Sequence, residues 1–115
     1  SHHLRRYSMR TDGFAAVSAP RSGGELITKP LTFTGERLHL NYSTSAAGDV
    51  RVEIQDVEGK PLPGYGLSDA KELIGNEIDG VYTWNSADDV KPLIGKPVRL
   101  RFLLKDAELF SFQFR

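Results

Sequence analysis

The sequence predicts an all-β domain, an antiparallel two-sheet β-sandwich of jelly-roll-like form with about eight strands. Apolar and polar residues alternate along most segments, and Gly, Pro and Asp turns recur at a spacing of roughly 8–14 residues. The alternation is clearest in Leu38–Ile54, which reads LHLNYSTSAAGDVRVEI. Its two alternating segments flank a run of small residues, which predicts two antiparallel strands joined by a turn, each with one buried and one solvated face.

The first segments of the chain predict a hairpin. Leu4–Arg10 alternates, with Tyr7 and Met9 on one face, and Thr11–Gly13 contains an Asp-Gly pair that favours a tight turn. Phe14–Ala19 reads as the second strand. Glu25–Thr28 and Leu31–Phe33 follow as short strands. The proline between them cannot donate a ladder hydrogen bond, which places this segment at an edge or a bulge.

The stretch after the central pair is the least strand-like part of the sequence. Pro61–Gly66 holds two prolines and two glycines, which indicates a surface loop with Tyr65 near its tip. In Leu67–Gly80, the residues Ser68 and Asp69 are suited to cap a short helical turn through Leu73 that Gly75 ends; the alternative is a loop that is irregular throughout. We expect any function to lie in the loops from Pro61 to Gly80.

The last third of the chain predicts three further strands. Val81–Asn85 is aromatic and β-branched, and Ala87–Ile94 predicts a short helical turn. Val98–Lys105 and Leu109–Arg115 are alternating strands joined by a reversal at Asp106-Ala107. The predicted core consists of one face of these strands and of the central pair, with Trp84 joining it: Leu38, Leu40, Val50, Val52, Ile54, Val98, Leu100, Phe102, Phe110, Phe112 and Phe114.

Composition narrows the class of partner. The chain has 115 residues, 15 Lys and Arg against 15 Asp and Glu, and no cysteine. A neutral balance disfavours nucleic acid, which basic proteins bind, and the lack of cysteine excludes disulfides, thiol catalysis and cysteine-ligated zinc. No apolar run reaches the ~20 residues of a membrane span.

The sequence contains few residues in arrangements that support catalysis. His39 is the one histidine beyond the opening Ser1-His2-His3, which we interpret as a possible remnant of a purification tag. It lies on the polar face of a predicted strand, whereas a Ser-His-Asp triad needs an oriented imidazole beside a nucleophile. Carboxylates that could pair for glycoside hydrolysis occur in no recognisable motif. We therefore expect no catalytic residues.

The sequence contains two candidate binding sites, one for a metal ion and one for carbohydrate. Asp69, Glu72, Asn76, Glu77 and Asp79 gather oxygen ligands in one stretch, which suits calcium, although a solvated loop with helix-capping carboxylates is the commoner explanation; no other cofactor is expected. Aromatic rings can stack on sugars, and Tyr65, Tyr82 and Trp84 are the candidates for a carbohydrate site. A single tryptophan in a small sandwich is more often part of the core.

Three blocks together resemble a known family. They are GELITKPLTF (residues 24–33), RLHLNYSTSAAGDVRVEIQDVEGKPLPG (37–64) and VRLRFLLKDAELFSFQFR (98–115), with VYTW before the last. The chain resembles the C-terminal β-sandwich of bacterial glycoside-hydrolase-like proteins of the invertase, levansucrase and arabinanase group. In that group the catalytic carboxylates lie in a five-bladed β-propeller, and no position here matches them.

The resemblance implies that residues 4–115 form one domain, the C-terminal part of a longer extracellular or periplasmic protein. Its implied role is a non-catalytic accessory domain that packs beside, or orients, a catalytic domain of the same parent chain. Two alternatives stay open. One is an autonomous carbohydrate-binding module. The other is a protein–protein interaction module that uses an outward strip of Ile27, Leu103 and Leu109.

Overall fold

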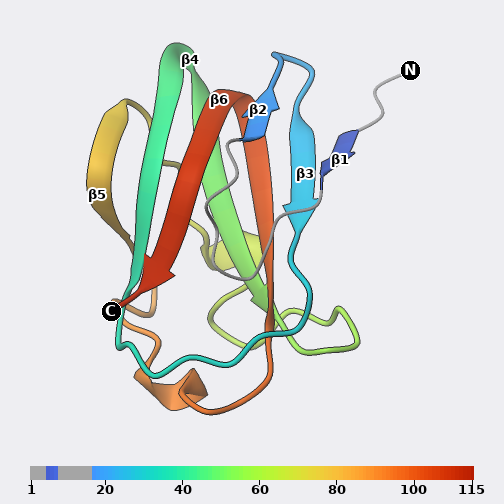
Figure 1. The fold of residues 1–115 in the computed structure, drawn as a ribbon, viewed down its shortest axis with the longest axis vertical. Helices are drawn as coiled ribbons and strands as arrows, with labels where there is room; N and C mark the ends of the chain where they lie inside the picture. The colour runs from blue at the N-terminus through green and yellow to red at the C-terminus, as the bar shows by residue number, and fades with distance from the viewer. Residues whose placement is uncertain (1–4, 8–16) are drawn as a thin grey trace.

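The structure, a computed structural model, describes residues 5–7 and 17–115 and is all-β (Figure 1). The described residues form six strands and two short 3₁₀ helices. The strands are β1 (Arg5–Tyr7), β2 (Val17–Ala19), β3 (Gly24–Ile27), β4 (Leu38–Gln55), β5 (Asn76–Tyr82) and β6 (Arg99–Phe114), and the helices are η1 (Leu67–Asp69) and η2 (Lys91–Leu93). The predicted all-β class is confirmed.

All six strands belong to one hydrogen-bonded sheet. Its order is β1-β3-β6-β4-β5, and β2 pairs with a further stretch of β6. β1 runs parallel to β3, and the other pairs are antiparallel. The predicted hairpin of the first two strands is wrong, because β1 pairs with β3 and β2 pairs with β6. Its predicted turn, Thr11–Gly13, lies outside the described residues.

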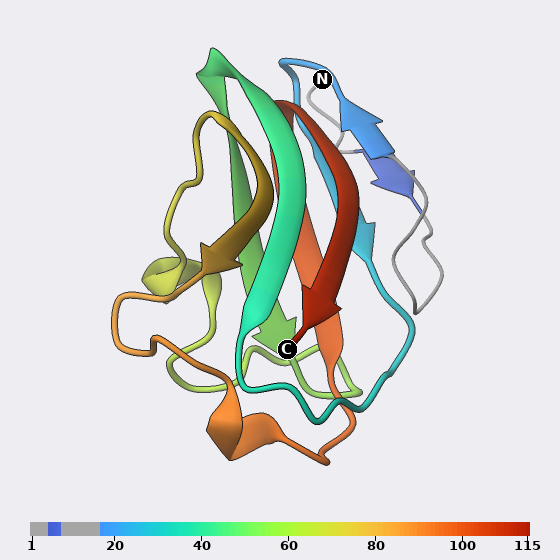
Figure 2. The same ribbon diagram turned by 60° about the vertical axis from the view of Figure 1, so that its left-hand side comes forward.

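The long strands β4 and β6 organise the sheet. They pair antiparallel from Leu38 opposite Phe114 to Gln55 opposite Arg99, with an interruption between Thr44 and Asp49. Figures 1 and 2 show both strands turning over at that point, at the top of the molecule. Leu38–Ile54 and Val98–Arg115 were each predicted to form a hairpin. Instead, the two segments pair with each other, as β4 with β6.

Two backbone features make this bend possible. A Cβ atom at Gly48 would collide with the carbonyl oxygens of Lys105 and Asp106, so only glycine lets the two strands approach this closely. Asp106 takes a left-handed conformation with φ 43°, which Asp tolerates better than most residues. A strong bend in each strand replaces the turns that the small residues and the Asp-Ala pair suggested.

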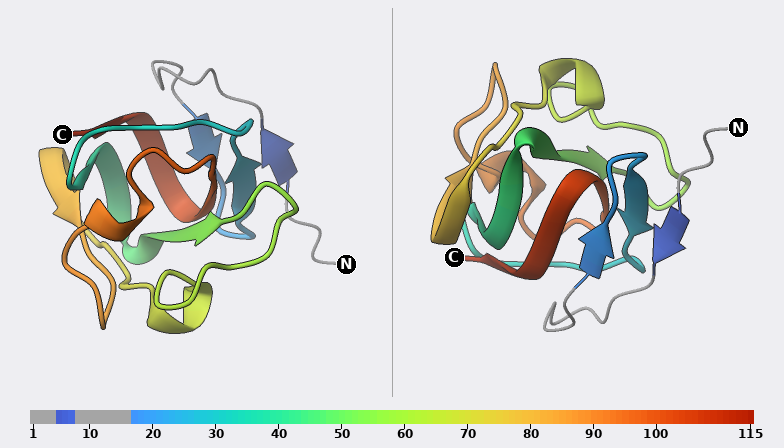
Figure 3. Two further views of the ribbon diagram at one scale, coloured as in Figure 1. Left: turned by 90° about the horizontal axis from the view of Figure 1, so that it is seen from below. Right: turned by 90° about the horizontal axis from the view of Figure 1, so that it is seen from above.

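The buried side chains form one core cluster. The end-on views in Figure 3 show the strands curling around the middle of the molecule. Buried side chains alternate along both arms of β4, with Leu38, Leu40 and Tyr42 in the first. The second arm contributes Val50, Val52 and Ile54, which are fully buried. Separate sheets and eight strands are not confirmed, because the described strands are continuous through the bends.

The predicted helical turns are too long, and the predicted capping is wrong: Ser68 and Asp69 lie inside η1, whose N-cap is Gly66 without a side-chain hydrogen bond. Helix η1 starts at Leu67 and ends at Asp69, and the chain from there to Gly75 is extended or irregular. η2 covers only Lys91–Leu93 of the turn expected over 87–94. Of the strand expected at Val81–Asn85, only Val81 and Tyr82 belong to β5, which begins at Asn76 in the stretch that was expected to be least strand-like.

Candidate ligand-binding groove

Two β-bulges face each other across the first arm of β4. Between β4 and β6, Asn41 lies opposite Ser111 while Tyr42 lies opposite Leu109, so Phe110 is an extra residue in β6. Between β4 and β5, Leu40 lies opposite Gly80 and Tyr42 opposite Glu77. Asn41 therefore faces the two residues Ile78 and Asp79. Bulges redirect side chains and are common beside functional sites.

The bulge in β6 corrects one predicted core residue. Phe112 is 5% exposed and points inward, but the extra residue reverses the alternation, so Leu109 is buried and Phe110 is 36% exposed. The expectation that Phe110 shares the core face with Phe112 and Phe114 is wrong for this reason. Leu109 was expected on an outward strip, and the same reversal buries it.

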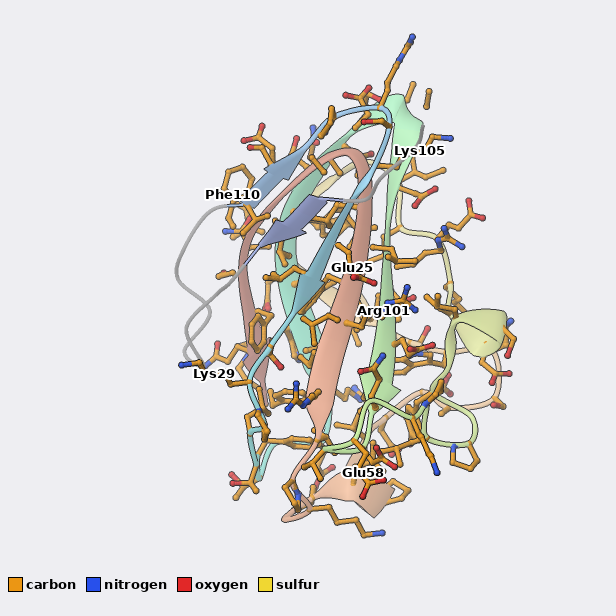
Figure 4. All side chains as sticks on the ribbon, turned by 90° about the vertical axis from the view of Figure 1, so that its right-hand side faces the viewer. Glu25, Lys29, Glu58, Arg101, Lys105 and Phe110 are labelled. Atoms are coloured by element: carbon orange, nitrogen blue, oxygen red, sulfur yellow. The ribbon has the colours of Figure 1, made fainter. Side chains whose placement is uncertain are left out.

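The bulged residues line an open groove of about 750 Å³ over β5, β4 and β6. Figure 4 shows the Phe110 side chain at the left-hand edge of the molecule. The groove combines an aromatic ring and an aliphatic side chain with amides, carboxylates and hydroxyls. Its lining residues are Asn41, Tyr42, Ser43, Asn76, Glu77, Ile78, Asp79 and Phe110.

A charged cluster closes one end of the groove. The Arg115 guanidinium donates a hydrogen bond to Asp79, and the His39 imidazole Nδ1 lies 2.9 Å from the same carboxylate oxygen. The hydrogen bond from Arg115 holds the pKa of the Asp79 carboxyl below its usual value. His39 Nδ1 is also 3.2 Å from the guanidinium, and within the described chain no hydroxyl bonds to the imidazole. The cluster is therefore not a catalytic triad.

The residues proposed for calcium do not converge on one point. Asp69 ends η1, Glu72 lies in the following loop, and the other three lie on β5. Asn76 accepts a hydrogen bond of 2.7 Å from the Ser43 hydroxyl, and Asp79 is held by Arg115. Among residues 17–115, no three His, Cys, Asp or Glu side chains are grouped to hold a metal ion. Three of the five expected ligands instead line the groove.

The aromatic residues expected to bind sugar form a buried cluster. Tyr65 is 6% exposed, and Tyr82 and Trp84 are fully buried, with both tyrosine rings packed edge-on against the indole. The Tyr82 hydroxyl donates to the Lys71 carbonyl and accepts from the Val52 N–H, and burial raises its pKa to about 12. With no free ring face, these residues offer no sugar platform. Trp84 lies in the core as predicted.

This cluster closes the free edge of the second arm of β4. Val50 exchanges two backbone hydrogen bonds with Leu73, and Ile54 bonds to the loop before η1. Between them, Val52 has its N–H bonded to the Tyr82 hydroxyl and its carbonyl bonded to the Trp84 indole N–H. An exposed strand edge promotes aggregation, and here each outward group on these three residues is satisfied. The Pro61–Gly66 loop therefore stabilises the fold by covering this strand edge.

A second polar cluster is structural. The Arg101 guanidinium lies 2.5 Å from the Glu25 carboxylate and 3.5 Å from that of Glu53, on the face shown in Figure 4. Glu53 also accepts hydrogen bonds from the Gln55 amide and the Leu67 N–H. Both carboxylates are buried and bound to the arginine, so they are not arranged as the acid and base of a glycosidase.

Comparison with known proteins adds no family to this picture. No protein-family model, curated protein or solved structure matches the chain. The resemblance to the invertase group stays a prediction. In the described residues, no helix is long and apolar enough to span a membrane.

Sequence reasoning missed Phe110, Asn41 and Ile78 as site residues, because alternation alone does not show where a bulge interrupts it.

Proposed function

We propose that this domain is a non-catalytic accessory module that binds carbohydrate in the groove between the two bulges. The observation that carries the proposal is the pair of facing bulges, which takes Phe110 out of the core and gives Asn41 two opposing residues. A hydrophobic ring kept in contact with solvent is unfavourable for stability, and a ligand that covers it offsets that cost.

The groove has the chemistry that sugars require. A sugar ring has an apolar C–H face, which suits stacking on the Phe110 ring and contact with Ile78, and a rim of hydroxyls. Amides and carboxylates of Asn41, Glu77 and Asp79 supply donors and acceptors for those hydroxyls. The open shape favours a segment of a chain over a small molecule that must be enclosed.

An accessory role agrees with the lack of catalytic geometry in the described residues. The imidazole of His39 is held by Asp79 and Arg115, and the buried carboxylates of Glu25 and Glu53 are bound to Arg101. The proposed context, beside a catalytic domain of the same parent chain in an extracellular or periplasmic protein, rests on the family resemblance.

A glycan array followed by calorimetry tests the proposal. We expect binding to a subset of polysaccharides, with affinity lowered at least tenfold in Phe110→Ala and in Asn41→Ala. Val57→Ala is the matched control, because Val57 is an equally exposed apolar residue in a turn that does not line the groove. An array without any binding, or equal affinity in all variants, would rule out the groove as a sugar site.

Docking on a neighbouring protein domain is the second candidate. Ile78 and Val81 on β5 are 83% and 41% exposed, Ile74 just before β5 is 57% exposed, and no described strand pairs with the outer edge of β5. Such an edge can accept a strand from a partner. This replaces the predicted strip of Ile27, Leu103 and Leu109, which the structure leaves half-buried or buried. Val81→Lys should then block docking and leave sugar binding unchanged.

A further inference from the structure

A second cavity, separate from the groove, lies on the outward face of the second arm of β4, near the bend. Its volume is about 230 Å³, and it is bounded by the turn after Pro20, by β4 and by β6. Figure 4 shows Lys105 at this end of the molecule, well away from Phe110. Three cationic residues line it, and they come from three different segments: Arg21, Arg51 and Lys105.

Strand register and one tight turn assemble these side chains. Asp49 pairs with Lys105 and Arg51 with Leu103, so alternation places all four on the outward face. The turn that carries Arg21 is fixed to the bend of β6, because the Pro20 carbonyl accepts hydrogen bonds of 2.9 Å from both Gly23 N–H and Asp106 N–H.

The cavity is positively charged in a protein that is neutral as a whole. Three cations and the single carboxylate of Asp49 leave a net charge of +2 (3 − 1), against +0 for the chain. Within the described residues, neither Arg21 nor Lys105 belongs to an ion pair. Glu72, which is not among the lining residues, is a further carboxylate that acts on Asp49.

Arg51 has a hydrogen-bond donor without an acceptor. Its Nε atom is buried without a hydrogen-bond partner, and it lies 3.6 Å from the Asp49 carboxylate, beyond hydrogen-bond distance. Burial, and to a smaller extent the Glu72 carboxylate, raise the pKa of Asp49 in spite of the nearby Arg51 and Lys105. The Nε atom itself has no exposed surface, but the Arg51 side chain is 37% exposed, so an anion in the cavity would contact the guanidinium at its other nitrogens.

We propose that this cavity binds a small doubly charged oxyanion of the sulfate or phosphate class. Guanidinium groups present planar N–H donors that match such oxygens, and the charge of the ligand would balance the +2 of the cavity. The apolar floor at Leu103 lowers the local dielectric and strengthens both interactions. The site is independent of the carbohydrate proposal, since no residue lines both cavities.

An NMR titration of the full chain tests this site. Sodium sulfate and sodium phosphate are added at matched ionic strength, with sodium chloride as the reference. We expect the Arg51 Nε–H signal to shift saturably with both oxyanions and not with chloride. Arg51→Gln and Lys105→Gln should each weaken binding about tenfold, and both variants are compared by their amide spectra to verify the fold. Arg37→Gln, the same charge change at an exposed arginine outside the cavity, should leave binding unchanged.

Three outcomes would overturn the proposal: shifts that grow linearly without saturation, equal shifts with chloride, or affinities unchanged in folded Arg51→Gln and Lys105→Gln variants. A further arm identifies the source of the oxyanion. Tighter binding of glucose 6-sulfate than of inorganic sulfate supports the site and assigns the anion to a sulfated sugar. Tighter binding of the inorganic anion supports the site and assigns it to the free ion.

Discussion

Replacing Tyr82 by Phe tests the closure of the β4 edge by aromatic side chains. The substitution keeps the ring and removes a hydroxyl that donates to the Lys71 carbonyl at 2.6 Å and accepts from the Val52 N–H at 3.1 Å. Val52 is fully buried, so its N–H loses its partner with no access to water. Leaving a buried donor unsatisfied costs about 1–3 kcal/mol, and the Lys71 carbonyl, on an exposed residue, adds little. We expect the free energy of unfolding to fall by about 2 kcal/mol in urea denaturation at pH 7.

The same residue makes the stability depend on alkaline pH. The folded-state pKa of Tyr82 is raised to about 12 from its ordinary 10, because burial disfavours the phenolate. The unfolded chain therefore loses this proton before the folded chain does. The associated stability is complete below pH 10 and is lost as the pH rises through 12. A two-unit shift corresponds to about 3 kcal/mol as an upper figure. Tyr82→Phe should show a smaller loss of stability between pH 10 and pH 12.

Tyr42→Phe is the matched control. Tyr42 is also a buried tyrosine of the core, but its hydroxyl lies at the groove, and among the described residues it forms no hydrogen bond. We expect its free energy of unfolding to change by less than about 0.5 kcal/mol. Equal, small losses in both variants would show that the Tyr82 hydroxyl does not stabilise the edge of β4, and would refute the reasoning.

Two further predictions concern the groove end and the bend. Arg115→Ala should raise the pKa of Asp79 toward its ordinary 3.8, because it removes the hydrogen bond that lowers it. The stability linked to the lowered pKa is present at neutral pH and is lost as the pH falls through that pKa, so the variant should be less stable at neutral pH and the difference should shrink in acid. Carboxyl-carbon NMR measures the shift, and an unchanged value contradicts the assignment. Gly48→Ala should destabilise the fold by about 2 kcal/mol or more in thermal unfolding, since its Cβ meets the carbonyls of Lys105 and Asp106. Unaltered stability would mean that the strands are not in close contact at the bend.

The sequence predicted the faces of the strands better than their partners. Alternation in Leu38–Ile54 correctly marks the buried apolar side chains, because period two follows from strand geometry, but it places Glu53 on the solvated face, whereas the structure buries it. It does not distinguish two strands joined by a turn from one strand that bends, since both leave small residues at the same place. Pairing partners depend on contacts distant in the chain. The pairing of β1 with β3, for example, has no local signal.

The same limit applies to the candidate site. Asn76, Glu77 and Asp79 were singled out from their oxygen atoms, and they do line the groove, but the predicted ligand was a metal ion. Phe110 was assigned to the core because its neighbours at positions 112 and 114 share its parity. One extra residue in β6 reverses that parity, and its effect is visible only in the register against β4.

Mapping a bound oligosaccharide on the amide NMR spectrum tests the central claim most directly. With a sugar selected from the glycan array, the account predicts the largest shifts at Asn41, Ile78 and Phe110, around the two bulges. Amides near the buried Tyr65 and Trp84 should move little. Shifts centred on the loop from Pro61 to Leu67, or spread evenly over the sheet, would contradict the proposal that the bulges build the binding site.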